Sequence, residues 1–201
     1  MSTHPVQLHI VRAERVPRIQ VAIRLVLVLA LGVVSWSAIY WLLYLALPAL
    51  VALELSHEGG EGYASRDAPR LVRGLKWLAG AYAFLGLLTN VLPTTEEGDG
   101  KGPVDLHVDV SRHPTVRSAF LRLVTSVPAL VLVAVLSVAA WFGWLIGAAC
   151  ALVIERVPRP LADFLMLVLR VKLRFIAYHL SLVDRYPSLG DPSLEPAPNL
   201  S

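Results

Sequence analysis

Two long stretches of the chain contain no charged residue. They run from Leu25 to Leu53 and from Leu123 to Ile154. Each exceeds the roughly 18 apolar residues that a membrane-spanning helix needs, and neither is long enough to cross twice. The pattern therefore predicts one tilted or kinked transmembrane helix in each stretch. Pro48 and Pro128 are the expected kink points, because proline interrupts the hydrogen bonds of a helix.

The sequence also repeats itself. PVQLHI at residues 5–10 is nearly matched by PVDLHV at 103–108, and the same offset of 98 relates Arg24 to Arg122. A repeat of this length predicts a tandem duplication. After the long stretches the offset becomes 94, and it then relates Lys76 to Arg170, Phe84 to Tyr178, Asn90 to Asp184 and Pro93 to Pro187.

Each half contains a second helical segment. In the first half, residues 70–93 are apolar enough from Trp77 to Leu92 to cross a bilayer. In the second half, residues 160–183 contain three cations near the middle, which makes insertion costly, so this helix either crosses or lies at the interface. Polar residues fall on two opposite sides of its helical wheel, a pattern that suits a helix packed between other helices or one sunk at the headgroup level.

The repeated hexapeptides alternate between apolar and polar residues, which is typical of a strand with one buried face. We expect two short strands that pair as a small ribbon outside the bilayer. The polar face would contain His9, Asp105, His107 and Asp109, which are weak candidates for a metal site because imidazole and carboxylate together suit a divalent ion. A solvated strand face is the favoured interpretation, so we expect no metal and no cofactor.

These features predict an all-α integral membrane protein. Each half would contain a short strand, a long kinked transmembrane helix and a second membrane helix, and a β ribbon would lie outside the membrane. The Gly-rich acidic segments 56–69 and 94–102 are typical of loops and linkers. The expected divisions are a first membrane repeat at 1–93, a linker at 94–102, a second membrane repeat at 103–187 and a disordered tail at 188–201.

Composition supports the membrane class. The chain has 201 residues, of which 56% are hydrophobic and 16% are charged, against about 25% charged in a soluble domain. A formal charge of +3 is too small to favour nucleic acid as a partner. The single cysteine, Cys150, excludes an internal disulfide. Lysine and arginine number nine on each predicted side, so orientation rests on the first helix alone, which favours cytoplasmic termini in a multi-pass protein of the cell membrane.

Two sets of residues are candidates for contacts with other molecules. The first set is basic and would contact lipids or anions: Arg73, Lys76, Arg170, Lys172 and Arg174. The alternative is that these cations snorkel or pair with Asp163 and Asp184 as structural ion pairs. The second set is a small-residue stripe for helix packing, within the protein or between protomers: Ala139, Gly143, Gly147 and Ala151.

The C-terminal half contains a PV-x-L strand, an apolar span with an early proline and an ending of the type AY…D-x-YP. In these features it resembles a prokaryotic membrane family known as domain of unknown function 4389, and we expect a bacterial protein. The matching residues are Pro103, Val104, Leu106, Pro128, Pro158, Asp163, Phe164, Arg170, Ala177, Tyr178, Asp184, Tyr186 and Pro187. The N-terminal half matches less well, with Asn90 in place of the aspartate. The resemblance implies a membrane architecture in two tandem copies and no catalytic activity.

Three function classes follow. The favoured one is a non-enzymatic membrane scaffold or accessory subunit, which would contact the lipid bilayer and either a second copy or another membrane protein. The alternative is a transporter or a protein that handles anionic lipids through the basic residues named above. A membrane enzyme is disfavoured, because no set of nucleophile, base and acid residues has a spacing that would bring the side chains together.

Overall fold

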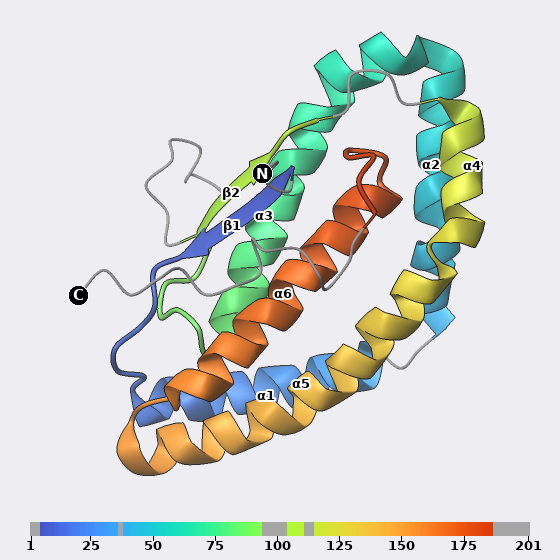
Figure 1. Ribbon diagram of the computed structural model, residues 1–201. Helices are drawn as coiled ribbons and strands as arrows, with labels where there is room; N and C mark the ends of the chain where they lie inside the picture. The colour runs from blue at the N-terminus through green and yellow to red at the C-terminus, as the bar shows by residue number, and fades with distance from the viewer. Residues whose placement is uncertain (1–4, 36–37, 94–103, 111–114, 187–201) are drawn as a thin grey trace.

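The computed structural model describes residues 5–35, 38–93, 104–110 and 115–186. This part of the chain is mostly helical, as predicted, and contains a two-stranded sheet (Figure 1). In chain order the elements are β1 (Val6–Ile10), α1 (Arg18–Ser35), α2 (Ala38–Gly62), a π-helix η1 (Tyr63–Asp67), α3 (Ala68–Leu85), β2 (Val104–Val108), α4 (Val116–Thr125), α5 (Val127–Ile154) and α6 (Arg159–His179).

The predicted ribbon is confirmed. Strands β1 and β2 pair in antiparallel fashion, and Leu8 lies directly opposite Leu106 at the centre of the register. The apolar side chains of both strands face the core, whereas Gln7, His9, Asp105 and His107 are exposed. Because α3 contacts β2 and α6 contacts β1, the buried face of the ribbon covers these two helices.

Helix α6 lies in the middle of the fold and contacts α3, α4, α5 and β1 (Figure 1). More than half of its residues are buried, including the charged Arg174. Packing between other helices is one of the two arrangements that its opposite polar stripes predict. Helix α6 ends at His179, four residues before the predicted end at residue 183. The backbone turns between these two points, at Ser181, where φ is 56°.

The N-terminal and C-terminal halves of the chain interlock. Helix α1 packs against α5, α2 packs against α4, and α3 packs against α6. In Figure 1, α4 and α5 form a long curve around α6, and α1 and α2 follow that curve in the opposite chain direction. The predicted repeats 1–93 and 103–187 therefore share one ribbon and one core, because buried residues of both belong to a single cluster.

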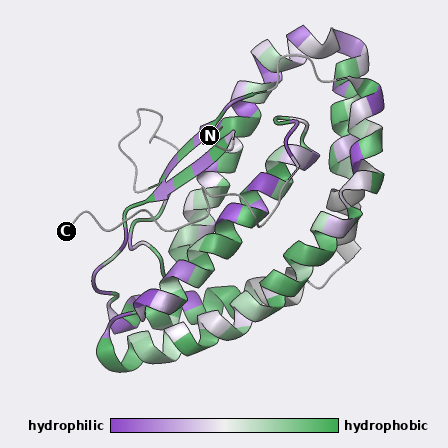
Figure 2. Cartoon of the chain, viewed as in Figure 1, coloured by the Kyte–Doolittle hydropathy of each residue, from purple (hydrophilic) through white to green (hydrophobic). Residues whose placement is uncertain are grey.

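Helix α5 has an apolar surface along its whole length (Figure 2). Within the described residues, it is the one helix that is long and apolar enough to cross a membrane, on the criteria of length and composition. About a fifth of its most apolar window is buried inside the protein. Many of its apolar side chains are exposed, including Val127, Val131, Val135, Val138, Trp141, Phe142, Ile146, Val153 and Ile154.

The helical curve bends just before α5. Helix α4 begins with a capping box, in which Thr115 and Ser118 exchange hydrogen bonds of 3.2 Å between side chain and backbone. It ends at Thr125, and α5 begins at Val127 with Pro128 in its first turn, where a missing N–H costs nothing. The break therefore lies where the sequence predicts it.

The prediction of a single helix over Leu25–Leu53 is wrong, because this stretch is divided between α1 and α2. The two helices run in different directions in Figure 1. Helix α2 continues through Pro48, and its non-helical backbone is at Gly59, with φ of 72°.

Two further boundaries differ from the predictions. The segment 56–69 is not a loop: α2 extends to Gly62, η1 follows, and Tyr63 is buried with its hydroxyl donating to the carbonyl of Leu180. This tertiary contact holds a helical conformation that the glycine content disfavours.

Helix α3 ends at Leu85, well before the predicted Leu92, so its apolar part is shorter than a membrane span. The predicted linker 94–102 and tail 188–201 lie outside the described residues.

Candidate functional site

Arg122 is a buried cation with several hydrogen-bond partners. It lies on α4, and 5% of its surface is exposed. Its Nη1 donates to the carbonyl oxygens of Tyr178, at 2.8 Å, and Val183, at 2.7 Å. Its Nη2 forms an ion pair with Asp184. The guanidinium therefore ties α4 to the end of α6.

The chemistry of a helix end explains this arrangement. The last carbonyls of a helix have no partner within the helix, and their negative dipole favours a cation. Arg122 supplies both a donor and a charge there, and its guanidinium lies 4.8 Å from the ring centroid of Tyr178. The hydroxyl of Tyr178 is in turn 3.0 Å from that of Thr125, so α4 and α6 are joined at two points.

Arg24 on α1 is also buried, with no exposed surface. Its Nη2 donates to Gln20 Oε1 at 2.9 Å and to Asn90 Oδ1 at 3.4 Å, and its guanidinium lies 3.9 Å from the ring centroid of Phe84. Its Nε and Nη1 have no hydrogen-bond partner among the described residues. At the Arg122 site the carboxylate of Asp184 neutralises the guanidinium. At the Arg24 site the guanidinium meets the amide of Asn90, which is neutral.

The ends of α3 and α6 have the same backbone conformation. Leu87 and Ser181, which the offset of 94 relates, have positive φ values of 61° and 56°. The following amides close the same hydrogen bond, from Leu88 N to Ala83 O at 2.9 Å and from Leu182 N to Ala177 O at 3.0 Å. A buried arginine lies against an aromatic ring at each of these helix ends: Arg24 against Phe84, and Arg122 against Tyr178.

The paired arginine sites are the feature that sequence reasoning missed. The offsets relate Arg24 to Arg122, Phe84 to Tyr178 and Asn90 to Asp184, which are the residues that meet in the two sites. The available signal was a cation at the same place in both halves, just before a long apolar stretch. The exchange of Asp184 for Asn90 changes the electrostatics, because a neutral amide cannot compensate a buried charge.

The predicted basic set is not brought together as one group. Arg73 is exposed, Lys76 and Arg170 are half-buried, and Arg174 is buried. Lys172 is half-buried, 5.4 Å from the ring centroid of Tyr82. These five cations therefore occupy different surroundings.

The two predicted structural carboxylates have partners on other elements. Asp163 forms an ion pair with Arg12, which follows β1, and Arg170 is close enough to Asp163 to interact with it electrostatically. Asp184 forms its ion pair with Arg122. The cation that pairs with Asp184 is thus Arg122 on α4, which the predicted basic set does not include.

The weak metal candidates share the exposed face of the ribbon. His9 lies opposite Asp105 and His107 lies opposite Gln7, while Asp109 follows the end of β2. Among the described residues, no three His, Cys, Asp or Glu side chains converge as a metal site.

The small-residue stripe of α5 divides into two parts. Gly143, Gly147 and Ala151 are buried, whereas Ala139 is exposed. A Cβ atom on Gly143 would lie 3.1 Å from Leu161 Cδ1, and one on Gly147 would lie 3.2 Å from Leu161 Cδ2. The missing side chains therefore allow the first turn of α6 to approach α5 closely.

Comparison with known families supports the resemblance for part of the chain. Residues 117–189 match the family model described as Domain of unknown function (DUF4389). The DUF4389 match is a single copy in the C-terminal half, and it includes α5, α6 and the Arg122 site. Searches of curated proteins and of solved structures give no match.

Proposed function

We propose that the chain is a multi-pass membrane protein with a scaffolding role, built from two copies of one helical unit. The observation that carries this proposal is the exposed apolar face of α5. A helix of 28 residues is about 42 Å long, which exceeds the roughly 30 Å of a hydrocarbon core. A soluble protein rarely exposes an apolar surface of this extent, whereas lipid or a membrane partner would cover it.

The proposed duplication has three supporting features. The ribbon is centred on Leu8 and Leu106, which are related by the offset of 98. The buried residues Arg24 and Arg122 are related by the same offset, and the ends of α3 and α6 by the offset of 94. A two-fold relation that exchanges the halves would account for all three. If its axis lies along the membrane normal, both halves have the same polarity.

The contacts of the polar groups in the Arg122 site support a scaffolding role. Its donors bind backbone carbonyls and a structural carboxylate, an arrangement that fixes helix positions and leaves no reactive group in contact with a substrate. The exposed face of α5 would then contact the bilayer, a second copy or another membrane protein. Anionic-lipid handling or transport through the five basic residues is the weaker proposal, since these residues occupy different surroundings.

Replacing Val135 and Val138 with lysine is expected to abolish stable membrane insertion. Both side chains lie on the exposed face of α5, 63% and 61% exposed, and each central lysine costs about 2.5–3.5 kcal/mol in a spanning helix. The measurement is the membrane-bound fraction after an alkaline carbonate wash. The matched control is Gln7→Lys on the exposed ribbon face, which should leave that fraction unchanged. Release of the unaltered protein by carbonate would contradict the proposal.

A further inference from the structure

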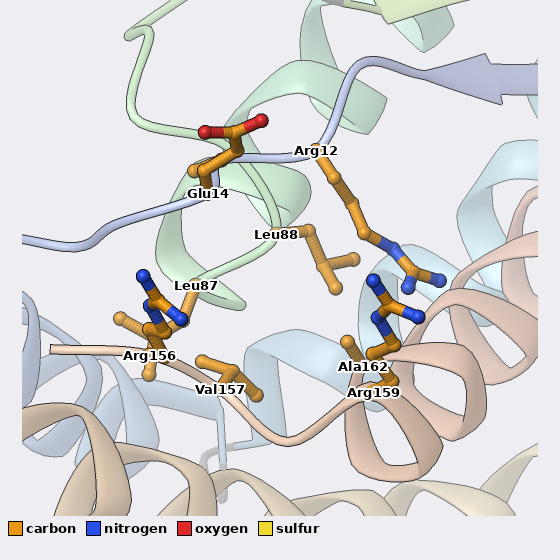
Figure 3. Close-up of a pocket in the computed structure, with 9 residues that line it drawn as sticks. Arg12, Glu14, Leu87, Leu88, Arg156, Val157, Arg159 and Ala162 are labelled. Carbon is orange, nitrogen blue, oxygen red and sulfur yellow. The ribbon is translucent and has the colours of Figure 1, made fainter. Parts of the chain in front are cut away.

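A pocket of about 470 Å³ lies where three loops meet, at the end of α5 (Figure 3). Its walls come from the segment after β1, the turn after α3 and the connection from α5 to α6. It is separate from the two buried arginine sites, because neither Arg24 nor Arg122 lines it. The proposed scaffolding role gives this pocket no function.

The lining of the pocket is strongly basic. Arg12, Arg156 and Arg159 line it together with a single acidic residue, Glu14, which leaves a formal charge of +2. Figure 3 shows the ends of the Arg12 and Arg159 side chains near one another and Arg156 across the hollow. Arg12 is partly neutralised by its ion pair with Asp163. Within the described residues, neither Arg156 nor Arg159 forms an ion pair.

The backbone adds to the positive potential. Helix α6 begins at Arg159, and its N-cap residue, Pro158, offers no side-chain acceptor. The positive end of the dipole of this 21-residue helix therefore faces the pocket without a capping group. Leu87, Leu88 and Val157 supply an apolar part of the wall, which strengthens electrostatic interactions by excluding water.

We propose that this pocket binds a phosphate-bearing anion. A guanidinium can donate two parallel hydrogen bonds to a phosphate, and three guanidiniums provide donors on several sides. The pocket lies just beyond the apolar stretch of α5, which is the depth at which a lipid phosphate would lie if α5 crosses the membrane. Both a phospholipid headgroup and a free organic phosphate have the required chemistry.

The double substitution Arg156→Gln and Arg159→Gln tests the site. Purified full-length protein in neutral detergent is mixed with phosphatidylglycerol or with glycerol 3-phosphate, and bound ligand is measured by native mass spectrometry. We expect each lost arginine to weaken binding about tenfold. The matched control is Arg66→Gln with Arg70→Gln, which removes two exposed arginines far from the pocket and should not change binding.

The two ligands distinguish the sources of the phosphate. Binding of phosphatidylglycerol alone, lost in the pocket variant, identifies a lipid headgroup site, and binding of glycerol 3-phosphate identifies a site for a soluble phosphate. Equal melting temperatures of the two double variants show that folding is intact, and Arg12→Gln alone provides a milder variant. Binding of neither ligand, or binding that is equally strong in the pocket variant and the control, overturns the proposal.

Discussion

Replacing Arg122 with methionine is expected to lower the free energy of unfolding by about 1–3 kcal/mol. The substitution roughly preserves volume but removes a donor from the carbonyls of Val183 and Tyr178, of which Tyr178 keeps the amide of Ser181. It also removes the counter-ion of Asp184, which is exposed. Buried acceptors that lose a partner retain their full cost of desolvation. The measurement is chemical denaturation in mild detergent, followed by tryptophan fluorescence.

The matched control is Arg24→Met in the N-terminal half. This arginine is equally buried, but two of its nitrogens have no hydrogen-bond partner within the described part of the chain and Asn90 does not neutralise it. Replacing a poorly compensated buried charge with an apolar side chain of similar size is often neutral or stabilising. We expect a change within about 1 kcal/mol of zero. Equal destabilisation by both substitutions would show that the two sites do not differ as described.

Replacing Gly143 or Gly147 with leucine is expected to cost about 1–3 kcal/mol for each position. A Cβ at either position already crowds Leu161, so a leucine side chain would force α6 away from α5. The measurements are the unfolding midpoint in detergent and the oligomer size from light scattering. A lower midpoint with unchanged oligomer size is the expected result.

Ala139→Leu is the control for this series, because Ala139 belongs to the same stripe but is exposed. Its effect on the unfolding midpoint should be small. If Ala139→Leu alters the oligomer size while the glycine variants leave the midpoint unchanged, the stripe packs between protomers and not against α6.

Local patterns predicted several elements correctly. The alternation of the hexapeptides predicted both strands and their buried faces, because period two is a local property of the backbone. Pro128 predicted the bend before α5. The opposed polar stripes of residues 160–183 predicted a helix that is packed between others or sunk at the headgroup level, and the structure shows the first arrangement. In each case the residues that define the feature are close together in sequence.

Features that depend on distant contacts were not predictable in the same way. The Gly-rich segment 56–69 is helical because Tyr63 reaches the end of α6. The Arg122 site joins residues about 60 positions apart, and only the fold shows that α4 lies at the end of α6. The repeat contained this information in part, since it relates all three members of one site to those of the other.

The central claim is that two copies of one unit cross the membrane with the same polarity. Reporter tags placed after Thr3, Gly98 and Glu195 test it most directly, because they lie before, between and after the two proposed copies. The account predicts that all three tags report the same compartment. A tag after Gly98 that reports the compartment opposite to the other two would contradict it.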